Sequence, residues 1–432
     1  MFLSEWTSIL LSSSRGSNQQ IRAAEALLSF MQQPSGCQQL LAAGGIPTFS
    51  TLLCQLANSS ANSTSSSSTG AHSTPIARQS VGSQEACSAV QHMAAAALQQ
   101  MLQEQPECWQ DVIAAGAVPA LGALLKRPHS ELSQQAAAAA LETLTAAADD
   151  RAACAEAFAQ ASIVTPAVRL LVSTNPDVQV SVAAMLTNLT AASDTCRTAA
   201  REAGGIPAAL RALRSTPAGP PFAIVQEWAL AFLSVTASTA IGAAEVCQSG
   251  GVVQIVRLLK SPCSAVRCNA ACAICTLAQN NTLACAEIES SGGIPALVQL
   301  LGSSNSDSRV LAHAVAALGW CMASSSSCAQ AARSAGAVPV LMQLVSHGSY
   351  DVRQTAAAAL EWAEAAGVEG GPYSLCSVGG GSEGEGGLEG ACQVPQQQLS
   401  ERVSDWLNSS QLSVCSTAST PAGPPGVVAG VP

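Results

Sequence analysis

Cysteine is the residue type of this sequence with the widest capacity for chemistry, because a thiolate can serve as a nucleophile, a metal ligand or a redox centre. The 432 residues include 17 cysteines. Cys268, Cys272 and Cys275 are spaced i, i+4 and i+7, which would place them on one face of a helix. No second cluster of Cys or His completes four zinc ligands, and a free cysteine packs as a small apolar residue. We therefore expect these three residues to replace alanine on a packed helix face.

Six more cysteines share one position, which lies 10–12 residues before the last residue of a pentapeptide that recurs along the chain. They are Cys37, Cys108, Cys154, Cys196, Cys285 and Cys328. A redox centre is needed once and not six times, so the repetition predicts a packing position. The odd total of 17 also favours a reducing compartment over a disulfide framework.

The remaining motifs predict no catalytic or cofactor site. Five histidines, at positions 72, 92, 129, 313 and 347, follow no metal-ligand spacing. The glycines at 379–381 lack the flanking strand and helix of a phosphate-binding loop, and no Gly-x-Ser-x-Gly elbow occurs. We therefore expect a protein that is not an enzyme and that binds neither a metal nor a cofactor.

The chain is acidic, with 28 acids, 18 bases and a net charge of −10. Nucleic-acid-binding proteins normally carry a basic stripe, and no run of basic residues occurs here. Neither nucleic acid nor an anionic membrane is expected as a primary partner. The sequence contains no run of 18 apolar residues, so no membrane-spanning helix is predicted. Glu5 lies where a secretory signal would be basic. We expect a cytoplasmic monomer, with the nucleus as the alternative location.

The pattern that organises the chain is an internal repeat. Apolar residues form 48% of the chain and aromatic residues only 3%, so the core must be built largely from alanine on closely packed helices. One pentapeptide, of the form Ala-Gly-Gly-Ile-Pro, recurs at 43–47, 115–119, 203–207, 291–295 and 335–339, with degenerate copies at 162–166 and 249–253. A second marker is the large aliphatic residue that ends each Ala-rich stretch: Leu27, Leu98, Leu141, Leu186, Leu233, Ile274, Leu318 and Leu360. Except for one step of 71 residues, the second marker recurs every 41–47 residues.

Each repeat is predicted to contain three helices. Glycine ends a short first helix, because only glycine adopts the left-handed C-terminal conformation without strain. Proline follows in the first turn of the second helix, where its missing N–H is no loss. Leu297, Leu300 and Leu301 show the i, i+3, i+4 apolar stripe of that helix. The third helix, for example 310–320, carries alanine at its crowded positions.

These motifs resemble the armadillo repeat family. The matching patterns are the Gly-x-Ile/Val-Pro-x-Leu-x-x-Leu-Leu second helix and the Val-x-x-x-Ala-Ala-x-Ala-Leu third helix, which 178–186 and 352–360 fit well. The resemblance covers residues 6–366 and implies an all-α fold, a right-handed α-solenoid of about eight repeats. Residues 1–42 are expected to form a partial capping repeat, and residues 43–366 the remaining repeats.

The resemblance also implies where a partner binds, because the third helices line the concave groove of such a solenoid. In armadillo proteins that import nuclear cargo, this helix carries a Trp and, four residues on, an Asn that clamps an extended peptide. The Asn position corresponds here to Thr143, Asn188, Val235, Thr276, Trp320 and Trp362. Only Asn188 matches, and no repeat carries the Trp. Trp320 and Trp362 are either an exposed aromatic pair that grips a partner or a cap on the core, whereas Trp228 is expected in the core.

Two segments depart from the repeat. The long step contains a Ser/Thr/Asn-rich insert at 58–86, expected to be a tolerated loop, with phosphorylation of 63–69 as an alternative. The Gly/Ser/Pro-rich tail at 367–432 has six acids and one base, Arg402, and is expected to be disordered. Within it, 396–408 predicts a short amphipathic helix that could fill the groove of a partner or of this chain. Its apolar residues are Leu399, Val403, Trp406 and Leu407.

The functional prediction is a non-catalytic adaptor that holds a protein or peptide in its concave groove. Two alternatives stay open. One is the substrate-recognition subunit of a ubiquitin ligase acting in trans, since the repeats begin by residue 6 and leave no room for a U-box before them. The other is a nuclear-import adaptor, which would bind basic peptides.

Overall fold

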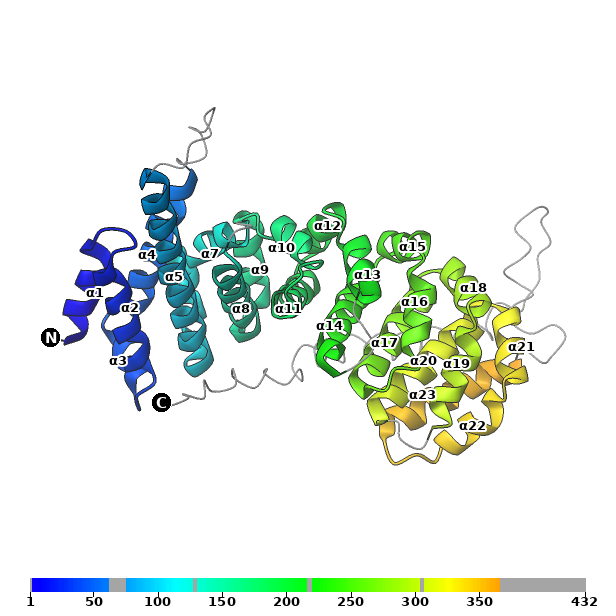
Figure 1. Ribbon diagram of the computed structural model, residues 1–432. Helices are drawn as coiled ribbons and strands as arrows, with labels where there is room; N and C mark the ends of the chain where they lie inside the picture. Colours follow the sequence, from blue (N-terminus) through cyan, green and yellow to red (C-terminus); the bar gives the residue numbers. More distant parts are fainter. Residues whose placement is uncertain (1, 62–74, 127–129, 216–219, 304–306, 366–432) are drawn as a thin grey trace, which may run out of the picture. The chain divides into compact units, whose positions relative to one another are not determined.

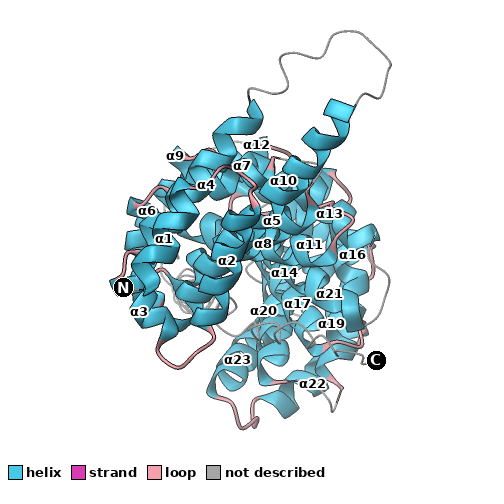
Figure 2. Ribbon diagram, turned by 60° about the vertical axis from the view of Figure 1, so that its left-hand side comes forward, coloured by secondary structure: helices cyan, strands magenta, loops and turns pink. Residues whose placement is uncertain are grey.

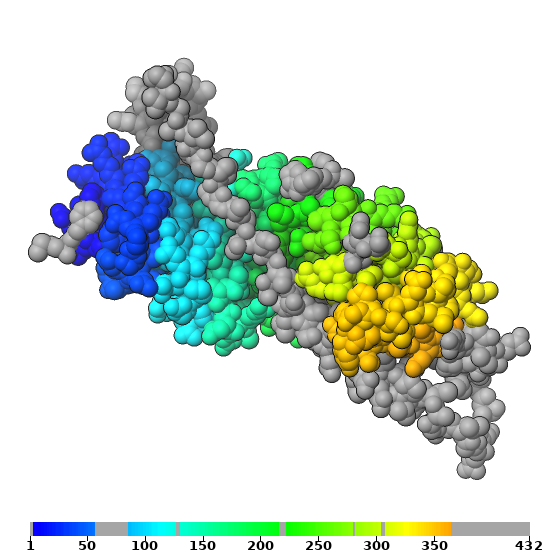
Figure 3. Space-filling view, turned by 90° about the horizontal axis from the view of Figure 1, so that it is seen from below, coloured from blue at the N-terminus to red at the C-terminus, as the bar shows by residue number. Residues whose placement is uncertain are grey.

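The computed structural model describes residues 2–61, 75–126, 130–215, 220–303 and 307–365. Within these ranges the chain forms twenty-three α-helices, one short 3-10 helix and no strand (Figure 2). The helices follow one another in chain order from α1 to α23 as a row of repeats (Figures 1 and 3). The predicted all-α solenoid of about eight repeats is thereby confirmed.

The helices fall into the three predicted sets. The first helices are α3 (Gly36–Ala42), η1 (Pro106–Cys108) with α6 (Trp109–Ala114), α9 (Arg151–Gln160), α12 (Asp194–Glu202), α15 (Ala240–Gln248), α18 (Thr282–Ser290) and α21 (Ser326–Ser334). The second helices are α1 (Phe2–Ser12), α4 (Gly45–Ala61), α7 (Ala117–Leu125), α10 (Val164–Leu170), α13 (Gly205–Ser215), α16 (Gly251–Leu258), α19 (Gly293–Leu301) and α22 (Ala337–Leu344). The third helices are α2 (Asn18–Met31), α5 (Pro75–Glu104), α8 (Glu131–Ala147), α11 (Pro176–Ala192), α14 (Pro220–Thr236), α17 (Ser264–Asn280), α20 (Ser308–Ser324) and α23 (Tyr350–Ala365).

A left-handed residue separates each first helix from the second. Six glycines take this conformation, with φ between 66° and 83°: Gly44, Gly116, Gly204, Gly250, Gly292 and Gly336. The degenerate copy at 162–166 has no glycine, and Ser162 adopts φ 53° in its place. The fold of the repeat therefore imposes the left-handed turn even at Ser162, where this conformation is sterically unfavourable.

Packing between third helices forms the core of the stack. Each third helix from α2 to α20 contacts the next one along the chain, so these eight helices make one continuous layer. Alanine makes this close approach possible. In α8, for example, Ala137, Ala138 and Ala140 are fully buried beside Leu141 and Leu144. The few aromatic residues include Trp228, which is 7% exposed, and its predicted place in the core is confirmed.

The N-terminal repeat consists of α1 and α2, and α3 completes the range 1–42, whose role as a capping repeat stays a prediction. The insert expected as a loop at 58–86 is in part helical, because α4 continues to Ala61 and α5 begins at Pro75. Proline at the start of α5 suits a helix N-terminus, where no N–H is needed. Only 62–74 of the insert lies outside the described residues, and this part includes the predicted phosphorylation segment 63–69.

The tail lies outside the described residues, as does its predicted helix at 396–408 with Leu399, Val403, Trp406 and Leu407. Among the described helices, none alone is long and apolar enough to cross a bilayer. The helical segment 106–114 and the following segment 117–125 reach that length and composition only as a pair bent by 85°.

Candidate protein-binding face

The six residues at the predicted clamp position form a row along the third helices, which we call the third-helix row. Thr143, Asn188, Val235, Thr276, Trp320 and Trp362 lie on α8, α11, α14, α17, α20 and α23, each two residues after the large aliphatic marker of its repeat. Consecutive members are therefore on helices that contact each other. Thr143, Trp320 and Trp362 are partly exposed, whereas the three central members are buried.

Asn188 is occupied by a contact between repeats. Its Nδ2 donates a hydrogen bond of 3.2 Å to Oγ1 of Thr145, one repeat earlier. Its Oδ1 is buried and has no hydrogen-bond partner among the described residues. Asn188 is the one residue that matches the peptide clamp of import adaptors. Its amide is engaged in a contact between repeats, and the residue is only 6% exposed.

Thr276 likewise serves the packing of the stack. Its hydroxyl donates to the carbonyl oxygen of Cys272 at 3.0 Å and lies 3.2 Å from the hydroxyl of Ser234 on α14. Val235 is apolar and 5% exposed. The middle of the third-helix row therefore joins repeats to one another, which leaves its two ends as the accessible parts.

Trp320 and Trp362 meet at the C-terminal end of the row. Their ring centroids are 6.1 Å apart and the ring planes are tilted by 42°. Gly319 makes room for the contact, because a Cβ at this residue would stand 3.1 Å from Cζ3 of Trp362. Both indoles remain partly exposed, and the Nε1 donor of Trp320 has no hydrogen-bond partner among the described residues. The pair combines features of both sequence interpretations, since the rings pack together and yet present surface.

Acidic groups lie close to the row, and reasoning from the sequence missed them. Burial raises the pKa of Glu142, next to Thr143, to about 7, while a hydrogen bond with Thr143 acts in the opposite direction. Burial also raises the pKa of Glu227 on α14, an effect that the positive charge of Arg309 opposes. Glu142 follows the alanine run 136–140 and Glu227 the apolar stretch 222–225, so both carboxylates lie in apolar segments of third helices where partial desolvation is expected.

Most of the described cysteines are packed inside the repeats. The six at the repeated first-helix position are all buried, which confirms a packing position. Thiol protons reach backbone carbonyls, as in the bond of 3.4 Å from Cys196 to Ala155. Cys268 is also buried, and burial is the main cause that raises its pKa to about 12. In the described part of the chain, no group of three or more His, Cys, Asp or Glu side chains is arranged to hold a metal ion.

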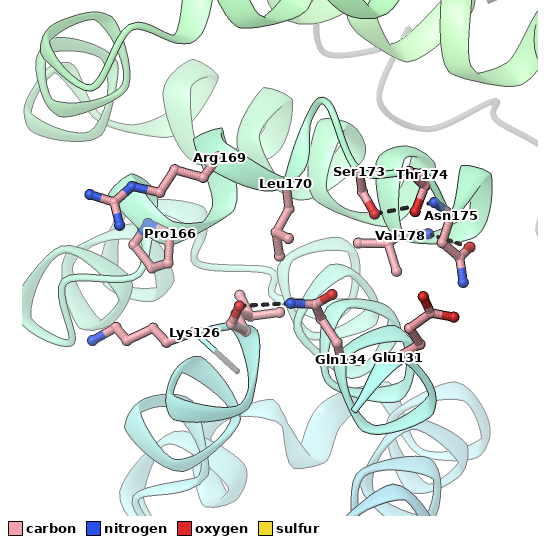
Figure 4. Close-up of a pocket in the computed structure, with 11 residues that line it drawn as sticks. Lys126, Glu131, Gln134, Pro166, Arg169, Leu170, Ser173, Thr174, Asn175 and Val178 are labelled. Atoms are coloured by element: carbon pink, nitrogen blue, oxygen red, sulfur yellow. Dashed lines mark hydrogen bonds between the residues drawn. The ribbon is translucent and has the colours of Figure 1, made fainter. Parts of the chain in front are cut away.

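A separate pocket of about 360 Å³ lies among α7, α8, α10 and α11. Figure 4 shows the side chains of Lys126 and Arg169 extending to one side of it and Glu131 standing on the other. Gln134 bridges the pocket wall by donating to the carbonyl oxygen of Leu125 at 2.9 Å. Lys126 and Arg169 are 43 positions apart, so a search for local clusters of charge in the sequence does not bring them together. Only an alignment of the repeats could have predicted that they meet.

Comparison with known proteins identifies the repeats in two segments. The profile of the Armadillo/beta-catenin-like repeat matches residues 105–146, and the profile of HEAT repeats matches residues 254–361. No curated protein matches the chain.

Similar structures have been solved for engineered proteins. One engineered protein is 32% identical, with a TM-score of 0.53 over 58% of this chain and 97% of its own. A computationally designed armadillo repeat protein for modular peptide recognition is 25% identical, with a TM-score of 0.51 over 57% of this chain and 99% of its own. A third, also an engineered protein, spans 84% of this chain and 98% of its own with a TM-score of 0.58, and its 24% identity supports the fold alone.

Proposed function

Because this chain belongs to the armadillo repeat family, we propose that it is a non-catalytic scaffold that binds an extended peptide segment of a partner protein along its third helices. The proposed contact surface is the third-helix row, with Trp320 and Trp362 as its anchor. The family is generally non-catalytic, and solvent-accessible aromatic pairs are among the strongest contributors to protein interfaces. We also propose a cytoplasmic location, to be tested by imaging a fluorescent fusion.

The Trp pair is the observation that carries this proposal. Two large apolar rings are partly exposed side by side at the end of a row whose middle is closed by contacts between repeats. The Nε1 donor of Trp320 lacks an acceptor among the described residues. An unsatisfied buried donor is costly, so a ring movement that admits a carbonyl of a bound peptide would recover that free energy. The similar designed protein made for modular peptide recognition supports the same use of the fold.

The direct test is peptide selection against the full chain, followed by calorimetric titration of the selected peptides. We expect the double substitution Trp320→Ala/Trp362→Ala to weaken binding by about thirtyfold or more, since truncation of one anchor residue of an interface costs about 2 kcal/mol or more. The matched control removes two large apolar side chains that are more exposed and lie elsewhere, Leu283→Ala/Met342→Ala, 74% and 64% exposed. Selected peptides that bind the Trp variant as tightly as the wild type would exclude the pair as anchor.

Nuclear import of basic cargo is not part of this proposal. Asn188 is the only asparagine among the six residues at the clamp position, and its side-chain amide donates a hydrogen bond to Thr145. A titration with a Lys-rich peptide distinguishes an import adaptor from the proposed scaffold. An import adaptor would bind the peptide, whereas the proposed scaffold is not expected to bind it. No described residue specifically favours the ubiquitin-ligase alternative.

A further inference from the structure

The last described repeat exposes an apolar residue at a position that the preceding repeats bury. Met342 on α22 lies six residues after the left-handed glycine of its repeat and is 64% exposed. The residues at this position in the three repeats before it are Leu210, Val256 and Val298, and each is at most 6% exposed. The difference in exposure therefore reflects the place of the repeat in the row and not the type of residue.

Three further positions of the last repeat show the same difference. Val345 is 37% exposed, whereas the leucines at its position in the preceding three repeats are at most 7% exposed. Val338 and Leu360 are partly exposed, whereas the residues at their positions in the same three repeats are at most 1% exposed. We call Val338, Met342, Val345 and Leu360 the end face.

Each internal junction covers the second-helix positions of this set with helices of the next repeat. Helix α16 contacts α13, α18 contacts α16, and both α21 and α22 contact α19. Helix α22 belongs to the last repeat of the described residues, so no following repeat covers the end face there. The end face is therefore unusual for a solenoid, because terminal repeats normally have a polar outer surface.

The other end of the row has the polar surface that the end face lacks. In α2, Asn18, Arg22, Glu25 and Ser29 recur at i, i+4, i+7 and i+11, and all four are exposed. Among the described residues, no large apolar side chain of α1 or α2 is exposed, whereas the last repeat has three that are. A polar end does not complement an apolar end, so head-to-tail stacking of copies is unfavourable.

The second helices also lose their charge towards the end face. Seven residues after the left-handed residue, α10, α13 and α16 carry an arginine, whereas α19 and α22 carry Gln299 and Gln343. Neither α19 nor α22 contains a charged residue. Across a two-fold axis a surface meets its own copy, so identical charges on it would repel each other. A glutamine amide both donates and accepts hydrogen bonds, so Gln343 beside the end face is compatible with its own copy.

We propose that the end face is the contact between two copies of this chain, which pair through it about a two-fold axis. The pairing buries Met342 and Val345 of each copy against apolar residues of the other, as the internal junctions do at the same positions. The assembly is closed at two copies, because each chain uses its one end face among the described residues. A dimer differs from the monomer expected from the sequence, so the mass in solution decides between them.

Sedimentation velocity of the full chain over a concentration series is the first test. We expect a monomer–dimer equilibrium whose mass never exceeds that of two chains. Met342→Glu and Met342→Lys, each alone, should raise the dissociation constant by about tenfold or more, since each places like charges on both sides of the contact. An equimolar mixture of the two variants should regain association as a mixed dimer, because opposite charges then face each other.

The matched controls are Leu283→Glu and Leu283→Lys, at an apolar residue of α18 that is 74% exposed and lies outside the end face. Both should dimerise like the wild type. Far-UV circular dichroism verifies that all variants fold. A chain that stays monomeric at every concentration would overturn the proposal, as would growth beyond two chains. The same conclusion would follow if Met342→Glu dimerised like the wild type, or if the mixture failed to recover association.

A photo-crosslinking residue in place of Met342 identifies what covers the end face. With benzoylphenylalanine at this position, we expect links between two chains that lead into residues 337–345, identified by mass spectrometry. Links that run only within one chain, for example to residues 366–432, would show that the chain covers its own end and would refute the pairing. Links only to α1 or α2 of another chain would refute it as well.

The pairing and the proposed peptide site can fail independently. The exposed side chains of the end face, Met342 and Val345, belong to a second helix, whereas the third-helix row carries the proposed peptide contact. Met342→Ala should therefore weaken the dimer without weakening peptide binding. Peptide titrations at concentrations where the chain is monomeric keep the two measurements separate.

Discussion

Trp320 and Trp362 lie one repeat apart in the sequence, and their ring centroids are 6.1 Å apart in the structure. The contact crosses from α20 to α23 above Gly319, the only residue type that leaves space for the ring of Trp362 there. Two partly exposed indoles are thereby held in one orientation at the end of the third-helix row. This relationship makes the pair both a stabilising contact and the anchor of the proposed peptide site.

The two indoles should be energetically coupled. A double-mutant cycle with Trp320→Ala, Trp362→Ala and the combined variant is expected to give an interaction free energy of about 0.5–1.5 kcal/mol, as for other tilted aromatic pairs. Urea unfolding of the four proteins provides the measurement. Strictly additive losses would show that the rings do not stabilise each other in solution.

Adding one methyl group at Gly319 should disturb the pair without deleting an aromatic ring. A Cβ there would stand 3.1 Å from Cζ3 and 3.4 Å from Cε3 of Trp362, so Gly319→Ala must displace that ring. The gain in helix propensity, about 1 kcal/mol, offsets part of the cost. We expect altered near-UV circular dichroism and weaker peptide binding, with unfolding stability within about 1 kcal/mol of the wild type. A near-UV spectrum identical to that of the wild type would contradict the contact.

Stability should depend on pH through Glu142. Burial raises the pKa of this carboxyl from 4.5 to about 7, so the fold favours the protonated form. The corresponding stabilisation is complete below pH 4.5 and is lost as the pH rises through about 7. Relative to Glu142→Gln, the wild type should therefore lose about 2–3 kcal/mol across this interval.

The comparison with Glu142→Gln is needed because another buried group titrates in an overlapping range with the opposite sign. Burial lowers the pKa of His313 to about 4, which favours the neutral ring and adds stability as the pH rises to 6.5. That contribution is common to both proteins and cancels in their difference. Parallel stability curves for the two proteins from pH 4 to pH 8 would refute the assignment to Glu142.

Replacing the strained serine of the degenerate repeat should stabilise the protein. Ser162 has φ 53°, where an L-residue pays about 1–2 kcal/mol and glycine does not. After the extra entropy of glycine in the unfolded chain, Ser162→Gly should gain about 0.5–1 kcal/mol. Gly116→Ser makes the reverse change at φ 73° in the preceding repeat and should lose a similar amount. Urea midpoints that do not move in opposite directions would argue against this backbone conformation.

Thiol labelling should distinguish buried from accessible cysteines. Cys272, Cys275 and Cys321 are at most 3% exposed, and burial contributes to the raised pKa of each. An aromatic disulfide reagent should modify partly exposed cysteines such as Cys247 first and these three only on unfolding. Mass mapping of labelled peptides at increasing urea follows the order. Early labelling of Cys275 in the native protein would contradict the packed third-helix layer.

The repeat architecture could be predicted because it depends on local patterns. Each turn between the first and second helix needs a left-handed residue, and six of the seven predicted turns place a glycine there. The prediction for the insert failed at its edges, where α4 and α5 run further than the Ser-rich composition suggested. Helix ends depend on packing against neighbours as well as on composition.

The sequence by itself determined the period, the three helices of each repeat and the alanine-based core, since each follows from spacing within about forty residues. The tertiary structure alone decided how equivalent positions use their side chains. Asn188 bonds to Thr145, while Trp320 meets Trp362 at the same position of later repeats. Lys126 and Arg169 are 43 positions apart in the sequence, yet stacking brings both to the wall of one pocket. The physical reason is that a solenoid places residues one period apart side by side, and what they do there depends on their mutual chemistry.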